Sequence, residues 1–280
     1  MTFIEKLVTL QQSRQSWLCL GLDPDVELMP AGIDVLTFNR RLIDATADLV
    51  SSYKLNLAFY MAFGLEGWSA LEQTLAHIPT EIPVILDAKF GDTGHTAKQY
   101  AKAAFEALKV DAVTASPYIG LDGILPLLDY PGKMVFVLVR STNTVGNDFQ
   151  LWPRPDSPLF RYVTGEVNTL GRKYPDQIGL GVAATHSDLA RVRSWAPALP
   201  FLIPGIGVQG GSLEDAVTYG GTRTVGPLVN ITRAIIYAGK DKDFDQAARG
   251  SAEAWLKQIR DLRQAARSRA HRTGEMPTVP

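Results

Sequence analysis

Eight short apolar runs alternate along this chain with longer segments of helical periodicity, and this alternation constrains the fold most strongly. Strands that each lead into an amphipathic helix are typical of the α/β class with a parallel sheet. About eight such units within about 240 residues match a (β/α)8 TIM barrel in number and length. The expected strands are residues 17–22, 53–57, 83–89, 112–116, 134–139, 178–184, 200–204 and 222–226. The clearest expected helices are residues 36–49, 96–108, 213–219 and 231–238.

A doubly wound open sheet is the competing α/β architecture. It usually has fewer strands or a second domain, and its G-x-G-x-x-G motif after the first strand is absent here. No linker rich in serine or proline divides the chain. We therefore predict a single barrel domain over residues 1–265, followed by a polar C-terminal tail over residues 266–280.

The charges of the chain almost cancel, with 28 Lys and Arg residues against 29 Asp and Glu residues and a formal net charge of −1. This balance argues against nucleic acid as a partner, although a local basic cluster can still bind a small phosphate ligand. No apolar stretch is long enough to span a bilayer, and the N-terminus does not resemble a signal peptide. Cys19 is the single cysteine and cannot form an internal disulfide, so we expect a reducing compartment, the cytoplasm. We expect no membrane partner.

Charged residues gather at the expected ends of the first three strands. Asp87 and Lys89 are two residues apart, so on a strand they share a face, and Asp92 follows closely. Asp23 ends the first strand and Lys54 lies on the second. In a barrel these strand ends meet at one rim, where active sites form, and opposite charges there keep one another ionised. The alternative is a surface ion cluster where a strand runs out into a turn.

The expected loops after strands seven and eight form a candidate anion site. The segment I-P-G-I-G-V-Q-G-G-S is rich in glycine, so its backbone amides, including that of Gly210, can approach a ligand, and Gln209 adds a side-chain donor. Arg233 follows the eighth strand, and its planar guanidinium suits a phosphate. These two loops are the usual phosphate site of such barrels. Alternatively, the glycines only form turns and Arg233 is a surface cation.

Several motifs together resemble one known family, the orotidine 5′-phosphate decarboxylases, in their longer bacterial branch. The family signature D-x-K-x-x-D is matched by D-A-K-F-G-D-T-G-H-T-A at residues 87–97. Further matches in the family's order are G-L-D-P, D-A-V-T-A-S-P-Y-I-G, V-L-V-R-S-T-N, P-G-I-G-V-Q-G-G and T-R-A-I-I-Y-A. Together they cover roughly residues 17–240, which is nearly the whole expected domain.

The resemblance implies a homodimer that converts orotidine 5′-monophosphate to UMP and CO2 in de novo pyrimidine biosynthesis, with neither metal nor cofactor. It makes Lys89 the proton donor to C6 and Asp87 the carboxylate beside the substrate's own. The other implied roles are Lys54 and Asp23 in the charged chain and at the ribose, Asp92 and Thr96 reaching the partner's site, Ser141 or Thr142 at the pyrimidine edge, and Gln209, Gly210 and Arg233 at the phosphate.

Two other functions stay open for a chain with these motifs. A related group of barrels, the sugar-phosphate decarboxylases and synthases, shares the D-x-K-x-x-D-x-G string but uses magnesium held by carboxylates. Lys54 on the second strand would repel that metal. A non-catalytic barrel that only binds a phosphate ligand would keep Gln209 and Arg233 but not the charges of residues 87–92. After the fifth strand the chain reads R-S-T-N-T-V-G, which leaves open whether Ser141 or Thr142 meets the base.

Overall fold

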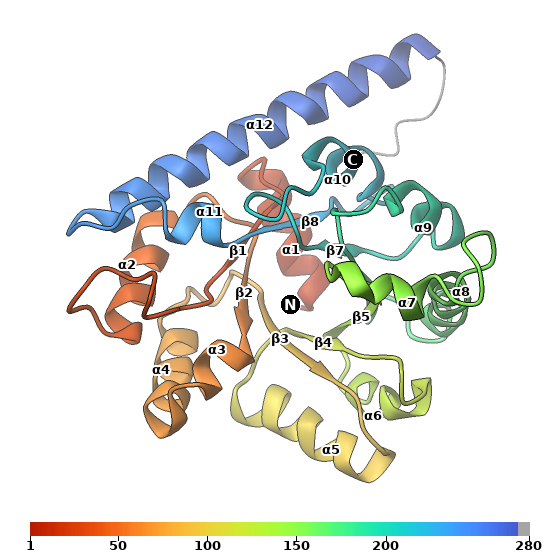
Figure 1. Ribbon diagram of the computed structural model, residues 1–280, viewed down its shortest axis with the longest axis horizontal. Helices are drawn as coiled ribbons and strands as arrows, with labels where there is room; N and C mark the ends of the chain where they lie inside the picture. Colours follow the sequence, from red (N-terminus) through yellow and green to blue (C-terminus); the bar gives the residue numbers. More distant parts are fainter. Residues whose placement is uncertain (274–280) are drawn as a thin grey trace.

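The computed structural model describes the backbone of residues 1–273 and the side chains of residues 1–268, and it contains a closed barrel of eight parallel strands. Neighbours in sequence are neighbours in the barrel, and β8 closes it by pairing with β1 (Figure 1). The predicted (β/α)8 TIM barrel is therefore confirmed. The strands are β1 Leu18–Gly21, β2 Ser52–Asn56, β3 Val84–Phe90, β4 Ala112–Ala115, β5 Met134–Arg140, β6 Ile178–Val182, β7 Phe201–Ile203 and β8 Leu228–Ile231.

Helices surround this barrel and connect its strands (Figure 1). The helix α5 continues into a single π-helical turn over Ala103–Ala107. The α-helices are α1 Phe3–Ser13, α2 Val35–Thr46, α3 Leu57–Met61, α4 Gly64–His77, α5 Gly94–Lys102, α6 Leu125–Leu128, α7 Asn147–Gln150, α8 Leu159–Gly171, α9 Leu189–Trp195, α10 Leu213–Tyr219, α11 Arg233–Ile236 and α12 Phe244–Thr273.

The inside of the barrel is filled by apolar side chains that the strands point inward. Cys19, Ile85, Phe136 and Leu202 belong to one buried cluster, and α1 packs Phe3 against it from the N-terminal end of the barrel. Phe3 meets Phe136 edge to face at a centroid distance of 5.7 Å. Because α1 closes this end, the opposite end, formed by the carboxyl ends of the strands, is the one left for a ligand.

Seven of the expected strands are confirmed with small shifts at their ends, but the eighth was placed wrongly. Residues 222–226 form a turn, in which the Thr222 hydroxyl accepts a hydrogen bond from Val225 N at 2.9 Å. The true strand is Leu228–Ile231. Threonine and valine favour strands by propensity, but a threonine side chain can also bond its own backbone and form a turn. The polar Asn230 interrupts the apolar pattern that would have identified the true strand.

The C-terminal helix α12 passes the predicted domain boundary at residue 265. Residues 274–280 of the predicted tail lie outside the described residues, so the boundary itself stays a prediction. Along residues 1–273, none of the helices combines the length and the apolar character needed to cross a bilayer.

Candidate active site

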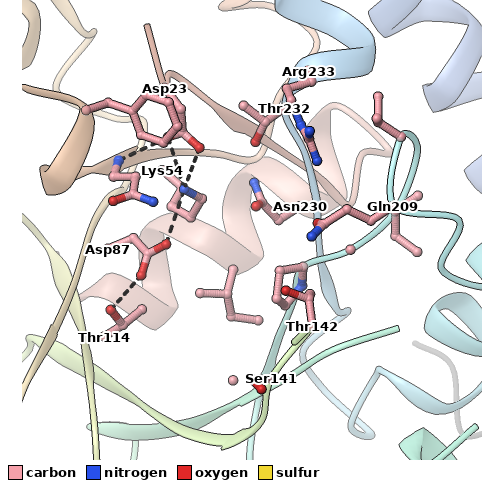
Figure 2. Close-up of a pocket in the computed structure, with 18 of the residues that line it drawn as sticks. Asp23, Lys54, Asp87, Thr114, Ser141, Thr142, Gln209, Asn230, Thr232 and Arg233 are labelled. Carbon is pink, nitrogen blue, oxygen red and sulfur yellow. Dashed lines mark hydrogen bonds and ion pairs between the residues drawn. The ribbon is translucent and has the colours of Figure 1, made fainter. Parts of the chain in front are cut away.

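A cavity of about 460 Å³ opens at the carboxyl ends of the strands, and every strand or the loop after it contributes to its wall (Figure 2). Phe136 and Leu202 of the inner core form part of its floor. The structure brings most of the predicted site residues to this one cavity. Those that line it are Asp23, Lys54, Asp87, Lys89, Ser141, Thr142, Gln209 and Arg233.

Four of these residues form an alternating row of ion pairs, here called the charged chain: Asp23, Lys54, Asp87 and Lys89. Lys54 Nζ lies 3.2 Å from Asp23 Oδ1 and 3.4 Å from Asp87 Oδ2. Lys89 Nζ lies 2.7 Å from Asp87 Oδ1. Figure 2 shows the Lys54 ammonium between the two carboxylates. The charges at the first three strand ends are thus one connected array, as expected from the sequence.

Burial and charge act in opposite directions on the charged chain. Burial opposes the charge of Lys54, whose side chain is only 4% exposed, but Asp23 and Asp87 outweigh it and raise the pKa of the ammonium. Burial likewise favours the neutral form of Asp87, but Lys54 and Lys89 outweigh it and lower the pKa of that carboxyl to about 2. At neutral pH the Lys54 ammonium and the Asp87 carboxylate are therefore both charged.

Thr114 at the end of β4 completes the environment of Asp87. Its hydroxyl donates to Asp87 Oδ1 at 2.8 Å and accepts from Lys89 N at 2.9 Å. One side chain thereby fixes both the carboxylate and the backbone that carries the lysine. Sequence reasoning missed Thr114, although its position at the end of the fourth expected strand was an available signal.

The backbone at Lys89 departs from regular strand geometry. Its φ is +53°, in the left-handed region, and the pairing of β3 with β4 shifts register between Leu86 and Phe90. For a residue with a Cβ this conformation costs on the order of 1 kcal/mol. Asp87 and Lys89 do meet, as predicted, but through this bulge rather than through regular alternation along the strand.

Tyr237, which follows α11, holds the loop after β1 that carries Asp23. The Tyr237 hydroxyl donates to Asp23 O at 2.9 Å and accepts from Asp25 N at 2.7 Å. Asn56 N also donates to Asp23 Oδ1 at 3.1 Å. Sequence reasoning missed Tyr237.

Polar residues of β8 and the position after it also line the cavity and were missed by sequence reasoning (Figure 2). Asn230 Nδ2 donates to Cys19 O at 3.1 Å, which ties β8 to β1. Thr232 lies between Asn230 and Arg233 in the chain. Neither residue was predicted as part of the site, because the eighth strand was placed too early in the chain.

The candidate anion site lies on the wall formed by the loops after β7 and β8. Gln209 and Arg233 approach the cavity from these two segments (Figure 2). Gly210 belongs to the same loop and has a φ of +74°, but it does not line the cavity. Ser212 caps α10 by accepting from Asp215 N.

Asp92 and Thr96, like Gly210, are predicted site residues that do not line the cavity. Asp92 Oδ1 accepts from Thr93 N at 2.7 Å, just before α5. Thr96 lies within α5. Their predicted role across a dimer interface stays a prediction.

Ser141 and Thr142 follow β5 and both reach the cavity wall. Ser141 Oγ accepts a hydrogen bond from Gln150 Nε2 at 2.9 Å. Within the described residues, no three His, Cys, Asp or Glu side chains are grouped so that they could hold a metal ion.

A family model described as "Orotidine 5'-phosphate decarboxylase / HUMPS family" matches residues 16–248. The chain belongs to this family. Its members include curated relatives named orotidine 5′-phosphate decarboxylase. One from Dehalococcoides mccartyi is 45% identical over 93% of this chain and 97% of its own length. Another from Herpetosiphon aurantiacus is 41% identical over 91% of this chain and 96% of its own.

Solved structures named OMP decarboxylase or UMP synthase have nearly the same fold as this chain. The Leishmania donovani OMP decarboxylase superposes with a TM-score of 0.82 at 38% identity, covering 94% of this chain and 99% of that one. The Leishmania donovani UMP synthase superposes with a TM-score of 0.81 at 39% identity, covering 92% of this chain but 56% of that one. The barrel of the family is therefore reproduced over almost the whole chain.

The lowered pKa of Asp87 predicts a pH-dependent part of the stability. A carboxyl with a depressed pKa stabilises the fold above its ordinary pKa of 3.8, and this contribution is lost as the pH falls through about 2. Relative to Asp87→Asn, the wild type should lose about 1 kcal/mol of unfolding free energy between pH 5 and pH 3. Urea titrations of both proteins measure this, and a difference that stays constant over this range contradicts it.

Proposed function

We propose that this protein decarboxylates orotidine 5′-monophosphate to UMP and CO2, a step of de novo pyrimidine biosynthesis. The observation that carries the proposal is the charged chain, which ends in Lys89 at a cavity large enough for a nucleotide. The curated relatives with this activity in their names support it, since they are 41% to 45% identical over nearly their full lengths.

Lys89 is the proton donor in this proposal. When the bond between C6 and the carboxylate breaks, the electron pair stays on C6, a ring carbon that resonance stabilises poorly. A fixed ammonium beside C6 stabilises that charge and then gives its proton to the carbon. The lysine regains a proton from water before the next turnover. Lys89 is suited to this because its ammonium is held by Asp87 at 2.7 Å while half of its side chain stays exposed.

Asp87 has two parts in the proposal. It orients Lys89, and it lies next to the carboxylate that the substrate loses. Because Lys54 and Lys89 keep Asp87 ionised, it repels the substrate carboxylate and raises the energy of the bound ground state. The stabilisation of the developing carbanion by Lys89 is the larger effect in this account, and the repulsion comes second.

The phosphate and the nucleoside occupy the other parts of the cavity. Gln209, Gly210 and Arg233 bind the phosphate, and the loop of residues 206–212 closes over it. Binding energy gained there, far from the reacting bond, orients the ring for reaction. Asp23 and Lys54 bind the ribose hydroxyls, and Ser141 or Thr142 meets the pyrimidine edge.

A homodimer in the cytoplasm completes the proposal. The Asp92 backbone lies against Gly123 in the segment after β4, and α5, which carries Thr96, contacts the same segment. In that segment Tyr118 is 79% exposed and Ile119 is 56% exposed. Exposed apolar side chains next to a polar pair are typical of a surface that a second subunit covers. Asp92 and Thr96 then reach the partner's cavity.

The magnesium-dependent alternative conflicts with the position of Lys54. In that alternative, carboxylates on neighbouring strands hold a divalent cation. Here the space between Asp23 and Asp87 contains the Lys54 ammonium, within 3.4 Å of both. A divalent cation at this position would meet a buried like charge.

The proposed function predicts turnover of orotidine 5′-monophosphate by the purified protein, measured as loss of the substrate's ultraviolet absorbance. Lys89→Ala should lower kcat by at least about a thousandfold, because it removes both the field and the proton at C6. The nucleotide affinity and the melting temperature should change little, since the lysine side chain is half-exposed. A variant that keeps most of its activity would exclude Lys89 as the proton donor.

Hybrid dimers test the role of Asp92. Asp92→Ala and Lys89→Ala proteins should each be nearly inactive alone. Mixing them should restore up to about a quarter of the wild-type activity, because one site of each hybrid dimer receives both intact residues. The control mixes Lys89→Ala with Asp87→Ala. It should give no rescue, because Asp87 and Lys89 line the cavity of their own chain and each site of the hybrid dimer then lacks one of them. Absence of any rescue by Asp92→Ala would place Asp92 in a site within one chain.

A chelator distinguishes the proposed metal-free decarboxylation from the magnesium-dependent alternative. Activity on orotidine 5′-monophosphate should persist after dialysis against EDTA, since Lys54 takes the place between the carboxylates. Loss of activity on chelation, with recovery on adding magnesium, would favour the magnesium-dependent alternative.

A further inference from the structure

Ser141, at the mouth of the cavity, is held from behind by one side chain that no part of the proposed mechanism uses. Gln150 at the end of α7 contacts it twice: Ser141 N donates to Gln150 Oε1 at 3.1 Å, and Gln150 Nε2 donates to Ser141 Oγ at 2.9 Å. Gln150 itself does not line the cavity. A serine hydroxyl has one proton to donate and two lone pairs. Since Gln150 uses a lone pair, the Ser141 proton stays available for a ligand.

Arg140 fixes which end of the Gln150 amide faces Ser141. Its Nη1 donates to Gln150 Oε1 at 2.9 Å, the same oxygen that accepts from Ser141 N. Two donors converge on this oxygen, so a flipped amide would set N–H groups against N–H groups. The hydrogen bond to Ser141 Oγ therefore runs from Gln150 to the serine and not the reverse.

Arg140 is in turn a buried anchor, and its side chain is 3% exposed. Its Nε pairs with Asp188 Oδ2 at 2.8 Å, which neutralises the charge, and its Nη2 donates to Asn147 Oδ1 at 2.7 Å. Arg140 thus binds both the first and the last residue of α7, a helix of four residues beside the end of β5 (Figure 1). A helix this short needs such external contacts to persist.

Gly146 leaves just enough space for the hydrogen bond between Gln150 and Ser141. A Cβ added to Gly146 would lie 2.8 Å from Ser141 Oγ and 3.3 Å from Gln150 Nε2, so only glycine leaves the pair undisturbed. Ser141 is therefore held at its amide and its hydroxyl by Gln150, which itself stays outside the cavity.

We propose that Gln150, fixed by Arg140, is a positioning residue that directs the Ser141 hydroxyl proton toward a carbonyl oxygen of the bound pyrimidine. This inference rests on the proposed function, because the pyrimidine is the ligand that it supplies. A hydroxyl held as a donor matches a ring carbonyl and mismatches a ring amino group. Gln150 thereby acts on substrate recognition through Ser141, without touching the substrate.

Gln150→Glu tests the direction of the hydrogen bond while keeping the structural contacts. A glutamate still accepts from Ser141 N and from Arg140, but it cannot donate to Ser141 Oγ. The Ser141 hydroxyl then donates its hydrogen bond to the Glu carboxylate, and its proton no longer points into the cavity. We expect kcat/KM for orotidine 5′-monophosphate to fall about tenfold and the Kd of UMP to rise about tenfold, with an unchanged or higher melting temperature.

Asn147→Asp is the matched control. It places the same charge on the same helix and also accepts from Arg140, but Asn147 bonds Arg140 rather than Ser141. Its kcat/KM should stay within about twofold of the wild type, as for a surface charge change. Equal losses in Gln150→Glu and Asn147→Asp would overturn the assignment in favour of a general effect of charge or structure.

A Ser141→Ala background completes the test, because a residue that acts through Ser141 should have no effect without its hydroxyl. Gln150→Glu should then cost nothing further in kcat/KM, and the same tenfold loss in both backgrounds would overturn the inference. If the wild-type protein turns over orotidine 5′-monophosphate and Gln150→Glu has the same kcat/KM, this inference is overturned and the proposed function stands. Absence of wild-type turnover overturns the proposed function, and this inference with it.

Discussion

The buried ammonium of Lys54 is the interaction on which the rest of the site depends. Removing an unpaired ammonium from water costs several kcal/mol, so the fold must bring compensating carboxylates to it. Asp23 and Asp87 do so from the two strands on either side of β2. The loop after β1 is therefore held in one place, with the help of Tyr237. The same contacts keep Asp87 ionised next to Lys89.

This arrangement divides the cavity into two ends with different chemistry. The β1 to β3 side carries the charged chain, in which each charge is neutralised by its neighbours. The β7 to β8 side carries Gln209 and Arg233, which suit an anion. The proposed substrate uses both ends, with its phosphate at the β7 to β8 side and its reacting carbon beside Lys89.

The sequence alone predicted the barrel and the charged chain because both depend on local patterns. Alternating strands and helices set the topology, and acids and bases at strand ends must meet at one rim. Three features depended on contacts that no local pattern carries. Asn230 places a polar residue in β8, which made that strand hard to recognise. The bulge at Lys89 appears as a register shift in the pairing of β3 with β4, which the sequence pattern does not show. The hydrogen bond from Gln150 to Ser141 joins side chains nine residues apart, which no helix or strand period brings together.

The central claim is that Lys54 sets the charge of Asp87, and a carbon NMR titration of the Asp87 carboxyl tests it most directly. In the wild type the pKa should lie near 2. In Lys54→Met, the pKa should rise well above that value, because burial then opposes the charge of Asp87 without the Lys54 ammonium to offset it. The same midpoint in both proteins would contradict the account.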